Sequence, residues 1–215
     1  MQKTWRTDCT FHELINEKGL AHRTSIIGIT GGIGSGKSYV AHLLSQHFGI
    51  PVYDTDSQAR RLMVESPQVR SELIQLLGSE AYTKQGELQK AVVARYLFAS
   101  SEHAARINAI VHPAVKSDFL LWASAQDRVV AIESAILLEA GFRDIVDCLV
   151  VVTAPMNLRI QRAMLRDGVG EEQVRQRMAQ QISEQERLQA ADYIINNDGR
   201  NLFPQLQILV EKYLS

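Results

Sequence analysis

The chain has 215 residues, a net charge of −1 at pH 7, 46% hydrophobic residues and 22% charged residues. This length fits one α/β domain with insertions or two small units that share a core, and the composition argues against disorder. Because the net charge is close to zero, we expect neither nucleic acid nor a membrane surface as a partner, and any bound anion must be held by locally placed groups.

Two features of the chain predict a cytoplasmic protein. Cys9 and Cys148 are the two cysteines, too few for a disulfide framework, and Cys148 falls inside an apolar run. No apolar stretch approaches the ~20 residues of a membrane helix, and the N-terminus lacks the apolar core of a secretory signal. Residues 1–24 are polar, with one short helix predicted at 11–15, and we interpret them as an extension of no assigned role.

Short apolar runs alternate with helical patterns along the rest of the chain. Because brief β-rich runs separated by helices require right-handed crossovers, this alternation predicts an α/β fold with a parallel sheet covered on both faces. The predicted strands are 26–30, 50–53, 129–132, 149–152 and 193–195.

Two long intervals between the predicted strands have helical patterns. The interval between the second and third strands contains predicted helices at 69–77, 90–98 and 103–111, and the interval 155–191 separates the last two strands. Both are much longer than a simple crossover. A helical insertion that faces a phosphate site is a natural place to hold a second substrate.

A glycine-rich loop directly follows the first predicted strand and precedes a helical pattern. In such a P-loop, glycines let several backbone N–H groups point at one anion, and the helix adds its positive N-terminal dipole. We expect Lys37 to reach the β- and γ-phosphates of a nucleotide and Ser38 to offer its hydroxyl to Mg²⁺. The predicted nucleotide-binding residues of this loop are Gly32, Ile33, Gly34, Ser35, Gly36, Lys37 and Ser38.

Asp54 and Asp56 follow the second predicted strand and are candidate catalytic carboxylates. If the chain is extended there, both side chains point to one side. Asp56 or Ser57 could simply cap a helix at 58–64. Alternatively, Asp54 caps and Asp56 orients an acceptor hydroxyl and takes its proton during phosphoryl transfer.

Glu133 ends the third predicted strand, where an acid that holds Mg²⁺ through water commonly lies in P-loop proteins. The alternative is that Glu133 only brings a buried strand to the surface. Glu139 is a weaker candidate.

Further candidates lie on the two helical intervals. Arg159, Arg162 and Arg166 fall on one helical stripe that could close over ATP, or could be a solvated face. His112 precedes Pro113 at the predicted end of a helix, where a structural role is favoured over a catalytic one.

Six segments, taken in order, resemble the motif set of the dephospho-CoA kinase family. The resemblance covers nearly all of residues 26–215 and departs from the usual pattern at Tyr39, where the family has Thr, and at Ala135, where it often has Pro. The segments are 29–38 (ITGGIGSGKS), 52–56 (VYDTD), 110–113 (IVHP), 135–139 (AILLE), 162–167 (RAMLRD) and 191–197 (ADYIINN).

The resemblance implies ATP- and Mg²⁺-dependent phosphorylation of the ribose 3′-hydroxyl of dephospho-coenzyme A, the last step of coenzyme A synthesis. It implies a sheet in the order 2-3-1-4-5, with Asp56 as general base and Lys37 and Arg162 as further catalytic groups. Arg162, Arg166, Asn197 and the backbone of Tyr39 would contact ATP. The implied division is a core (25–56, 121–154, 191–215), a CoA-binding insertion (57–120) and a lid (155–190).

Two other functions are compatible with the loop alone. A nucleoside monophosphate kinase needs arginines in the insertion for its acceptor phosphate, where Arg95 and Arg106 are the candidates after Arg70. A nucleotide-operated switch would need a guanine-reading Asn-Lys-x-Asp motif, which the sequence lacks. The expected partners are ATP and dephospho-CoA, with the chain a monomer or weak homo-oligomer.

Overall fold

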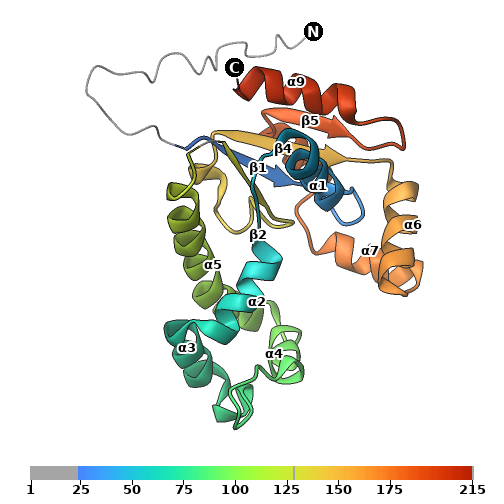
Figure 1. Ribbon diagram of the computed structural model, residues 1–215. Coiled ribbons are helices and arrows are strands. Elements are labelled where there is room, and N and C mark those ends of the chain that lie inside the picture. The colour runs from blue at the N-terminus through green and yellow to red at the C-terminus, as the bar shows by residue number, and fades with distance from the viewer. Residues whose placement is uncertain (1–23, 128, 215) are drawn as a thin grey trace.

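The structure, a computed structural model, describes residues 24–127 and 129–214. A five-stranded parallel sheet in the order β2-β3-β1-β4-β5 forms its centre (Figure 1). The α/β fold and the strand order are therefore confirmed, and each strand lies within two residues of its expected position. The strands are β1 (Ile26–Thr30), β2 (Val52–Asp54), β3 (Val130–Glu133), β4 (Cys148–Thr153) and β5 (Tyr193–Asn196).

Helices fill the intervals between the strands, except that β3 and β4 are joined by a segment with one short 3₁₀ turn. Four of the helices, α2 to α5, form the long connection from β2 to β3, and α6 to α8 form the connection from β4 to β5. The helices are α1 (Lys37–Phe48), α2 (Thr55–Glu65), α3 (Pro67–Leu77), α4 (Lys90–Leu97), α5 (Ser101–Ser124), α6 (Met156–Asp167), α7 (Glu171–Ala179), α8 (Glu184–Ala190) and α9 (Phe203–Leu214), with short 3₁₀ turns η2 (Ser79–Ala81) and η3 (Arg143–Ile145).

Both faces of the sheet are buried, which explains why the strands are continuous apolar runs. In β1, Ile27 and Ile29 pack on the face covered by α1 and α9, whereas Ile26 packs on the opposite face with α5. The same alternation runs along β4, where Cys148 is buried in the first cluster, as expected, and Leu149 lies in the second. This two-sided core fixes the strand ends from which the functional side chains project.

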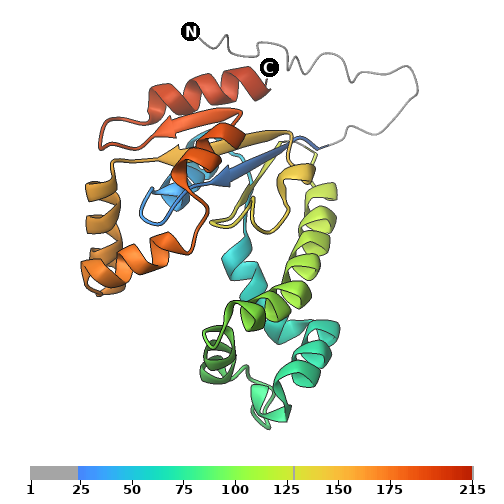
Figure 2. The same ribbon diagram turned by 180° about the vertical axis from the view of Figure 1, so that it is seen from behind.

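The helices α2 to α5 extend away from the sheet (Figures 1 and 2). A small apolar cluster holds their far end together, formed by Val69 and Leu73 of α3 with Ala81 and Tyr82. Helices expected at 69–77 and 90–98 are confirmed as α3 and α4. The helices α2 to α5 are therefore packed together at their far end.

The predicted end of α5 was wrong, because the helix continues through Pro113 to Ser124. Proline removes one backbone hydrogen bond and favours an end to the helix. Here the buried residues Ile107, Val111, Val115 and Phe119 recur every four positions and pack continuously on the core. This packing outweighs the local signal, so His112 lies within the helix rather than at its terminus.

The helices α6, α7 and α8 confirm the helical interval expected before β5. Ile160 and Ala163 of α6 pack against Val174 of α7 in a small cluster of their own, and Ile33 of the glycine-rich loop joins it. Ser183 and Glu186 form a reciprocal capping box that starts α8. The unit is thus tied to the loop by apolar packing.

In the part of the chain that the structure describes, no helix is both long and apolar enough to cross a membrane. The short helix expected at 11–15 lies outside the described residues, as does nearly all of the predicted extension.

Candidate active site

The loop between β1 and α1 is built to curl around an anion. Gly34 (φ +76°) and Gly36 (φ +89°) have left-handed backbones that disfavour any side chain, and Gly36 precedes α1 without a side-chain cap. Ser35 N–H donates to Gly32 O at 3.0 Å and tightens the turn. The first N–H groups of α1 therefore face the space that the loop encloses, which favours a phosphate group there.

Glu133, at the end of β3, meets the last two residues of the loop motif. Its Oε1 accepts a hydrogen bond from Ser38 Oγ at 2.6 Å and lies 3.4 Å from Lys37 Nζ. The parallel pairing of Ile29 with Glu133 produces this meeting, because β1 and β3 end side by side. The predicted metal-binding pair and the predicted phosphate-binding lysine are thus brought together at the carboxyl ends of the strands.

Asp54 and Asp56 have separate structural surroundings. The chain is not extended through Asp56, because α2 already begins at Thr55, so the alternation considered from the sequence does not apply. Asp54 caps this helix: its side chain accepts from Asp56 N–H at 3.0 Å and from Ser57 Oγ. Capping by Asp56 or Ser57 was therefore wrong, whereas the alternative with Asp54 as the cap is confirmed. Among the described residues, the Asp56 carboxylate has no hydrogen-bond partner.

A partly buried polar cluster links α2 to α5. Asp118 Oδ2, on α5, accepts hydrogen bonds from Tyr53 OH and from Arg61 Nη2, each at 2.6 Å. Burial, reinforced by the neighbouring Asp118, raises the pKa of Tyr53, so the phenol stays a hydrogen-bond donor. Tyr53 precedes Asp56 and Arg61 follows it in the chain. The hydrogen bonds of both residues to Asp118 therefore help to fix the position of Asp56.

Arg162 and Asn197 meet over the same loop from α6 and from the end of β5. Asn197 Nδ2 donates to Ser35 O at 2.9 Å, and Arg162 Nη1 donates to Asn197 O at 3.1 Å. Space is tight here, because a Cβ on Gly36 would lie 2.1 Å from Asn197 Nδ2. Both predicted nucleotide-binding residues therefore contact the loop or each other, while the Tyr39 side chain is 56% exposed.

Arg166 lies one turn further along α6 than Arg162 and interacts electrostatically with Asp56. Hydrogen bonds to Asp167 raise the pKa of Arg166, and the negative charge of Asp56 contributes in the same direction. Arg166, a predicted ATP-binding residue, and Asp56, the predicted general base, are therefore close enough to interact electrostatically. The arginine stripe is not uniform, however, because Arg159 is buried rather than solvated.

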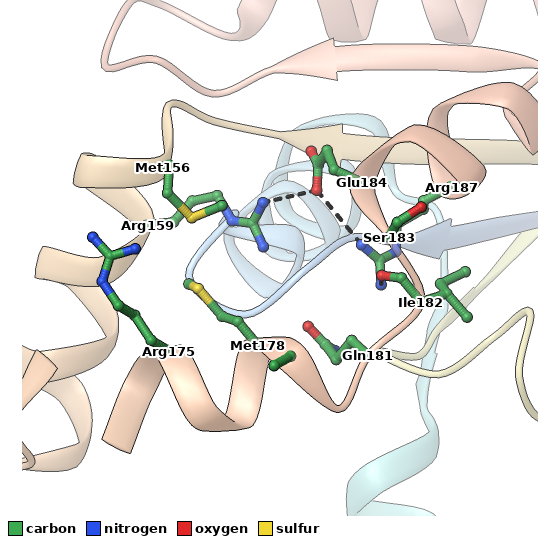
Figure 3. Close-up of a pocket in the computed structure, with 10 residues that line it drawn as sticks. Met156, Arg159, Arg175, Met178, Gln181, Ile182, Ser183, Glu184 and Arg187 are labelled. Carbon is green, nitrogen blue, oxygen red and sulfur yellow. Dashed lines mark hydrogen bonds and ion pairs between the residues drawn. The ribbon is translucent and has the colours of Figure 1, made fainter. Parts of the chain in front are cut away.

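Arg159 belongs to a cavity of about 390 Å³ on the inner side of α6 to α8 (Figure 3). Its Nη1 lies 2.7 Å from Glu184 Oε2, which is also 3.5 Å from Arg187 Nη1. Burial lowers the pKa of Arg187, against the raising effect of Glu139 and Glu184. The sequence predicted neither Glu184 nor Arg187: Arg159 and Glu184 are 25 residues apart and leave no local pattern, and the i, i+3 spacing of Glu184 and Arg187 alone does not indicate a buried site.

A second cavity, of about 200 Å³, opens between α2, α4 and α5. Asp56 forms part of its wall, together with Ser134 and the side chains of Asn108 and His112. Burial lowers the pKa of His112, which favours the neutral imidazole. The other lining residues are Thr55, Ala59, Met63, Val93, Leu97, Ile107, Val111, Val115, Ile136, Ala140 and Phe142.

This cavity has no arginine or lysine for an acceptor phosphate among the described residues that line it. Arg70 is instead held by the backbone of Val64 and Gly86, and Arg106 pairs with Glu102 on its own helix. The arginines considered for a nucleoside monophosphate acceptor are thus not gathered around the cavity. The lining suits an uncharged, largely apolar part of an acceptor.

The glycine-rich loop, the lysine and the carboxylates at the strand ends define a P-loop kinase of the α/β class. The family model for dephospho-CoA kinase matches residues 25–202. A curated dephospho-CoA kinase of Bacteroides fragilis is 47% identical over 86% of this chain and 90% of its own length. The chain belongs to the dephospho-CoA kinase family, and its activity is the phosphorylation of dephospho-CoA, the final step of coenzyme A biosynthesis.

Solved structures agree with the observed architecture. A Thermus thermophilus protein is 32% identical and superposes with a TM-score of 0.76, over 89% of this chain and 99% of its own. The dephospho-CoA kinase of Campylobacter jejuni, at 21% identity, gives a TM-score of 0.64 over 88% of this chain and 96% of its own, which supports the fold. The nucleotide-operated switch considered from the sequence has no support in these relatives.

Proposed function

We propose that the loop at residues 31–38 binds the triphosphate of ATP in this reaction. Its curled backbone and the start of α1 supply N–H donors, and Lys37 supplies the charge that reaches the β- and γ-phosphates. Lys37 is close enough to Glu133, at 3.4 Å, to be held in place before the nucleotide arrives. ATP binding by these groups is thus largely preorganised.

We propose that Ser38 and Glu133 would hold Mg²⁺ when the nucleotide binds. A hydroxyl and a carboxylate are hard oxygen ligands, and Mg²⁺ in such sites is held by one or two protein groups together with waters and phosphates. No cluster of three or more acidic, histidine or cysteine side chains that could hold an ion occurs among the described residues, which fits this sparse mode. When bound, the ion would neutralise charge on the transferred phosphoryl group.

Asp56 is the residue we assign to the acceptor hydroxyl. Asp54 takes the capping role, so the carboxylate of Asp56 is left to accept a hydrogen bond from a substrate. The transition state of phosphoryl transfer is loose, and Asp56 would therefore act mainly by orienting the hydroxyl and would take its proton late. Arg162 and Arg166 would neutralise charge that develops on the phosphoryl group.

The helical units then receive separate tasks. The insertion 57–120, which holds α3, α4 and most of α2 and α5, would bind dephospho-CoA. The segment 155–190, which contains α6 to α8, would act as a lid over ATP, and the core would be 25–56, 121–154 and 191–215. Asn197 would lie beside the ATP base. We further predict that the protein is cytoplasmic and that it is a monomer or a weak homo-oligomer. Residues 1–24 receive no role in this proposal.

The observation that carries the proposal is that Asp56 and the loop motif lie at the same edge of the sheet, with Arg166 coupled to Asp56. The test is a coupled assay of ADP release with dephospho-CoA, AMP, CMP and shikimate as acceptors. We expect turnover with dephospho-CoA at least 100-fold above that with the others. Preferred turnover of AMP, CMP or shikimate would overturn the acceptor assignment.

A further inference from the structure

Ile33, at the tip of the glycine-rich loop, is held by the proposed lid in three ways. Its backbone N–H donates to Gln181 Oε1 at 3.0 Å, and its backbone C=O accepts from Arg159 Nε at 3.0 Å. Its side chain packs in the cluster of Ile160, Ala163 and Val174. Both the N–H and the C=O of Ile33 are therefore taken by the lid, from both ends of the lid segment. Ile33, which the sequence predicted to bind nucleotide, thus has no free backbone N–H for a phosphate, and the phosphate donors must come from the rest of the loop and the start of α1.

Arg159, which donates to the C=O of Ile33, is itself held in place by other contacts. It is 4% exposed, and its Nη1 is paired with Glu184 Oε2 at 2.7 Å (Figure 3). Thr153 Oγ1 donates to the same glutamate at 2.5 Å. A Cβ placed on Gly32 would lie 2.0 Å from Arg159 Nη2, so the guanidinium rests directly on the loop backbone. The ion pair with Glu184 and the close approach to Gly32 hold the Arg159 guanidinium against the loop.

Gln181, which accepts from the N–H of Ile33, lies on the short link between α7 and α8. Arg187 Nη2 donates to Ile182 O at 3.3 Å, and Ile182 N–H lies 3.4 Å from Glu139 Oε1, so the link itself is anchored. Ser183 then starts α8 with its capping box. The amide of Gln181 therefore stands on a segment whose position is set by its neighbours on both sides.

The loop needs such support because its glycines permit other shapes. Gly34, directly after Ile33, has a backbone conformation that glycine adopts at little cost, and glycine also readily leaves it. A loop that must be reordered when ATP binds loses affinity, whereas a loop already held in its binding shape does not.

We propose that Gln181 is a positioning residue that, with Arg159, clamps Ile33 and so sets the affinity for ATP. The inference rests on the proposed role of the loop in binding ATP. It assigns to Gln181 no contact with either substrate. Its effect should therefore appear in ATP binding and be small in acceptor binding and in turnover at saturating ATP.

The test compares Gln181→Met, which keeps the length of the side chain but removes the accepting oxygen, with Gln180→Met at the exposed neighbouring position. We expect the Kd for Mg-ATP, measured by calorimetry without acceptor, to rise about 5- to 30-fold in Gln181→Met and less than twofold in Gln180→Met. In the kinase assay, KM for dephospho-CoA and kcat should stay within threefold of the wild-type values.

Hydrogen exchange of the Ile33 amide gives a second readout that is independent of activity. We expect exchange to be at least tenfold faster in Gln181→Met, and protection to return in Gln181→Glu, which restores an oxygen acceptor. Unchanged ATP affinity in Gln181→Met, or an equal loss in Gln180→Met, would overturn the clamp. Failure of the wild-type protein to bind ATP would instead overturn the proposed function of the loop.

Discussion

Ser38 Oγ donates a 2.6 Å hydrogen bond to Glu133 Oε1, across 95 residues of sequence. The bond joins the start of α1 to the end of β3, and the same carboxylate oxygen lies 3.4 Å from Lys37 Nζ. A hydroxyl, a carboxylate and an ammonium group thus meet where the loop opens. We infer that nucleotide and metal are bound at this one point.

Glu133→Gln should weaken the use of Mg²⁺ without unfolding the protein. The amide keeps the shape of the side chain and can still bond Ser38, but the negative charge that suits a divalent cation is lost. We expect the Mg²⁺ concentration that gives half the maximal rate to rise at least tenfold, measured by titration at saturating ATP.

The matched control is Glu102→Gln, which removes a carboxylate from an exposed ion pair with Arg106. It should leave the Mg²⁺ dependence within twofold of the wild-type value. An unchanged Mg²⁺ dependence in Glu133→Gln would remove Glu133 from the metal site.

Gly36→Ala should abolish ATP binding by crowding the loop. Gly36 has φ +89°, which is strained for alanine, and its new Cβ would lie 2.1 Å from Asn197 Nδ2. We expect the Kd for Mg-ATP to rise at least 100-fold in calorimetry. Gly170→Ala is the control, because no atom lies within 4 Å of the added methyl group, and it should bind ATP within twofold of wild type.

His112 predicts a pH dependence of stability. Burial lowers the pKa of His112 in the folded protein below its value of about 6.5 in the unfolded chain. As the pH falls below 6.5, the unfolded chain takes up the proton first, so the free energy of unfolding decreases toward the folded pKa. His112→Gln should show a smaller decrease between pH 7 and pH 5 in urea unfolding, and an identical slope would contradict this account.

Local sequence patterns were sufficient for the loop and for the positions of the strands, whereas the order of the strands was implied by the resemblance to the family. The glycine-rich loop before Lys37 has its typical sequence context, with an apolar strand before it and a helical pattern after it. Each strand is an apolar run of ordinary length, so its position could be recognised from the sequence. The interval before β3 could likewise be recognised as helical from its period. Its helix α5 could not be bounded correctly, since Pro113 is a local stop signal that long-range packing overrides.

The separate roles of the residues in the site depend on contacts between distant parts of the chain, which no local sequence pattern indicates. The sequence offers Asp54 and Asp56 two residues apart, and only the start of α2 at Thr55 decides which of them caps. Arg159 shares a helical stripe with Arg162, yet its partner Glu184 makes it a buried structural residue. Gln181 had no signal at all, because its partner is a backbone amide 148 residues away.

The most direct measurement of the central claim compares kcat in Asp56→Asn and Asp54→Asn, which remove the same charge two residues apart. Asparagine caps helices as well as aspartate does, so Asp54→Asn should stay within about fivefold of the wild-type kcat. Asp56→Asn should lower kcat by ~10²-fold or more while its Kd for Mg-ATP stays within twofold. An Asp56→Asn variant with the wild-type kcat would contradict the account.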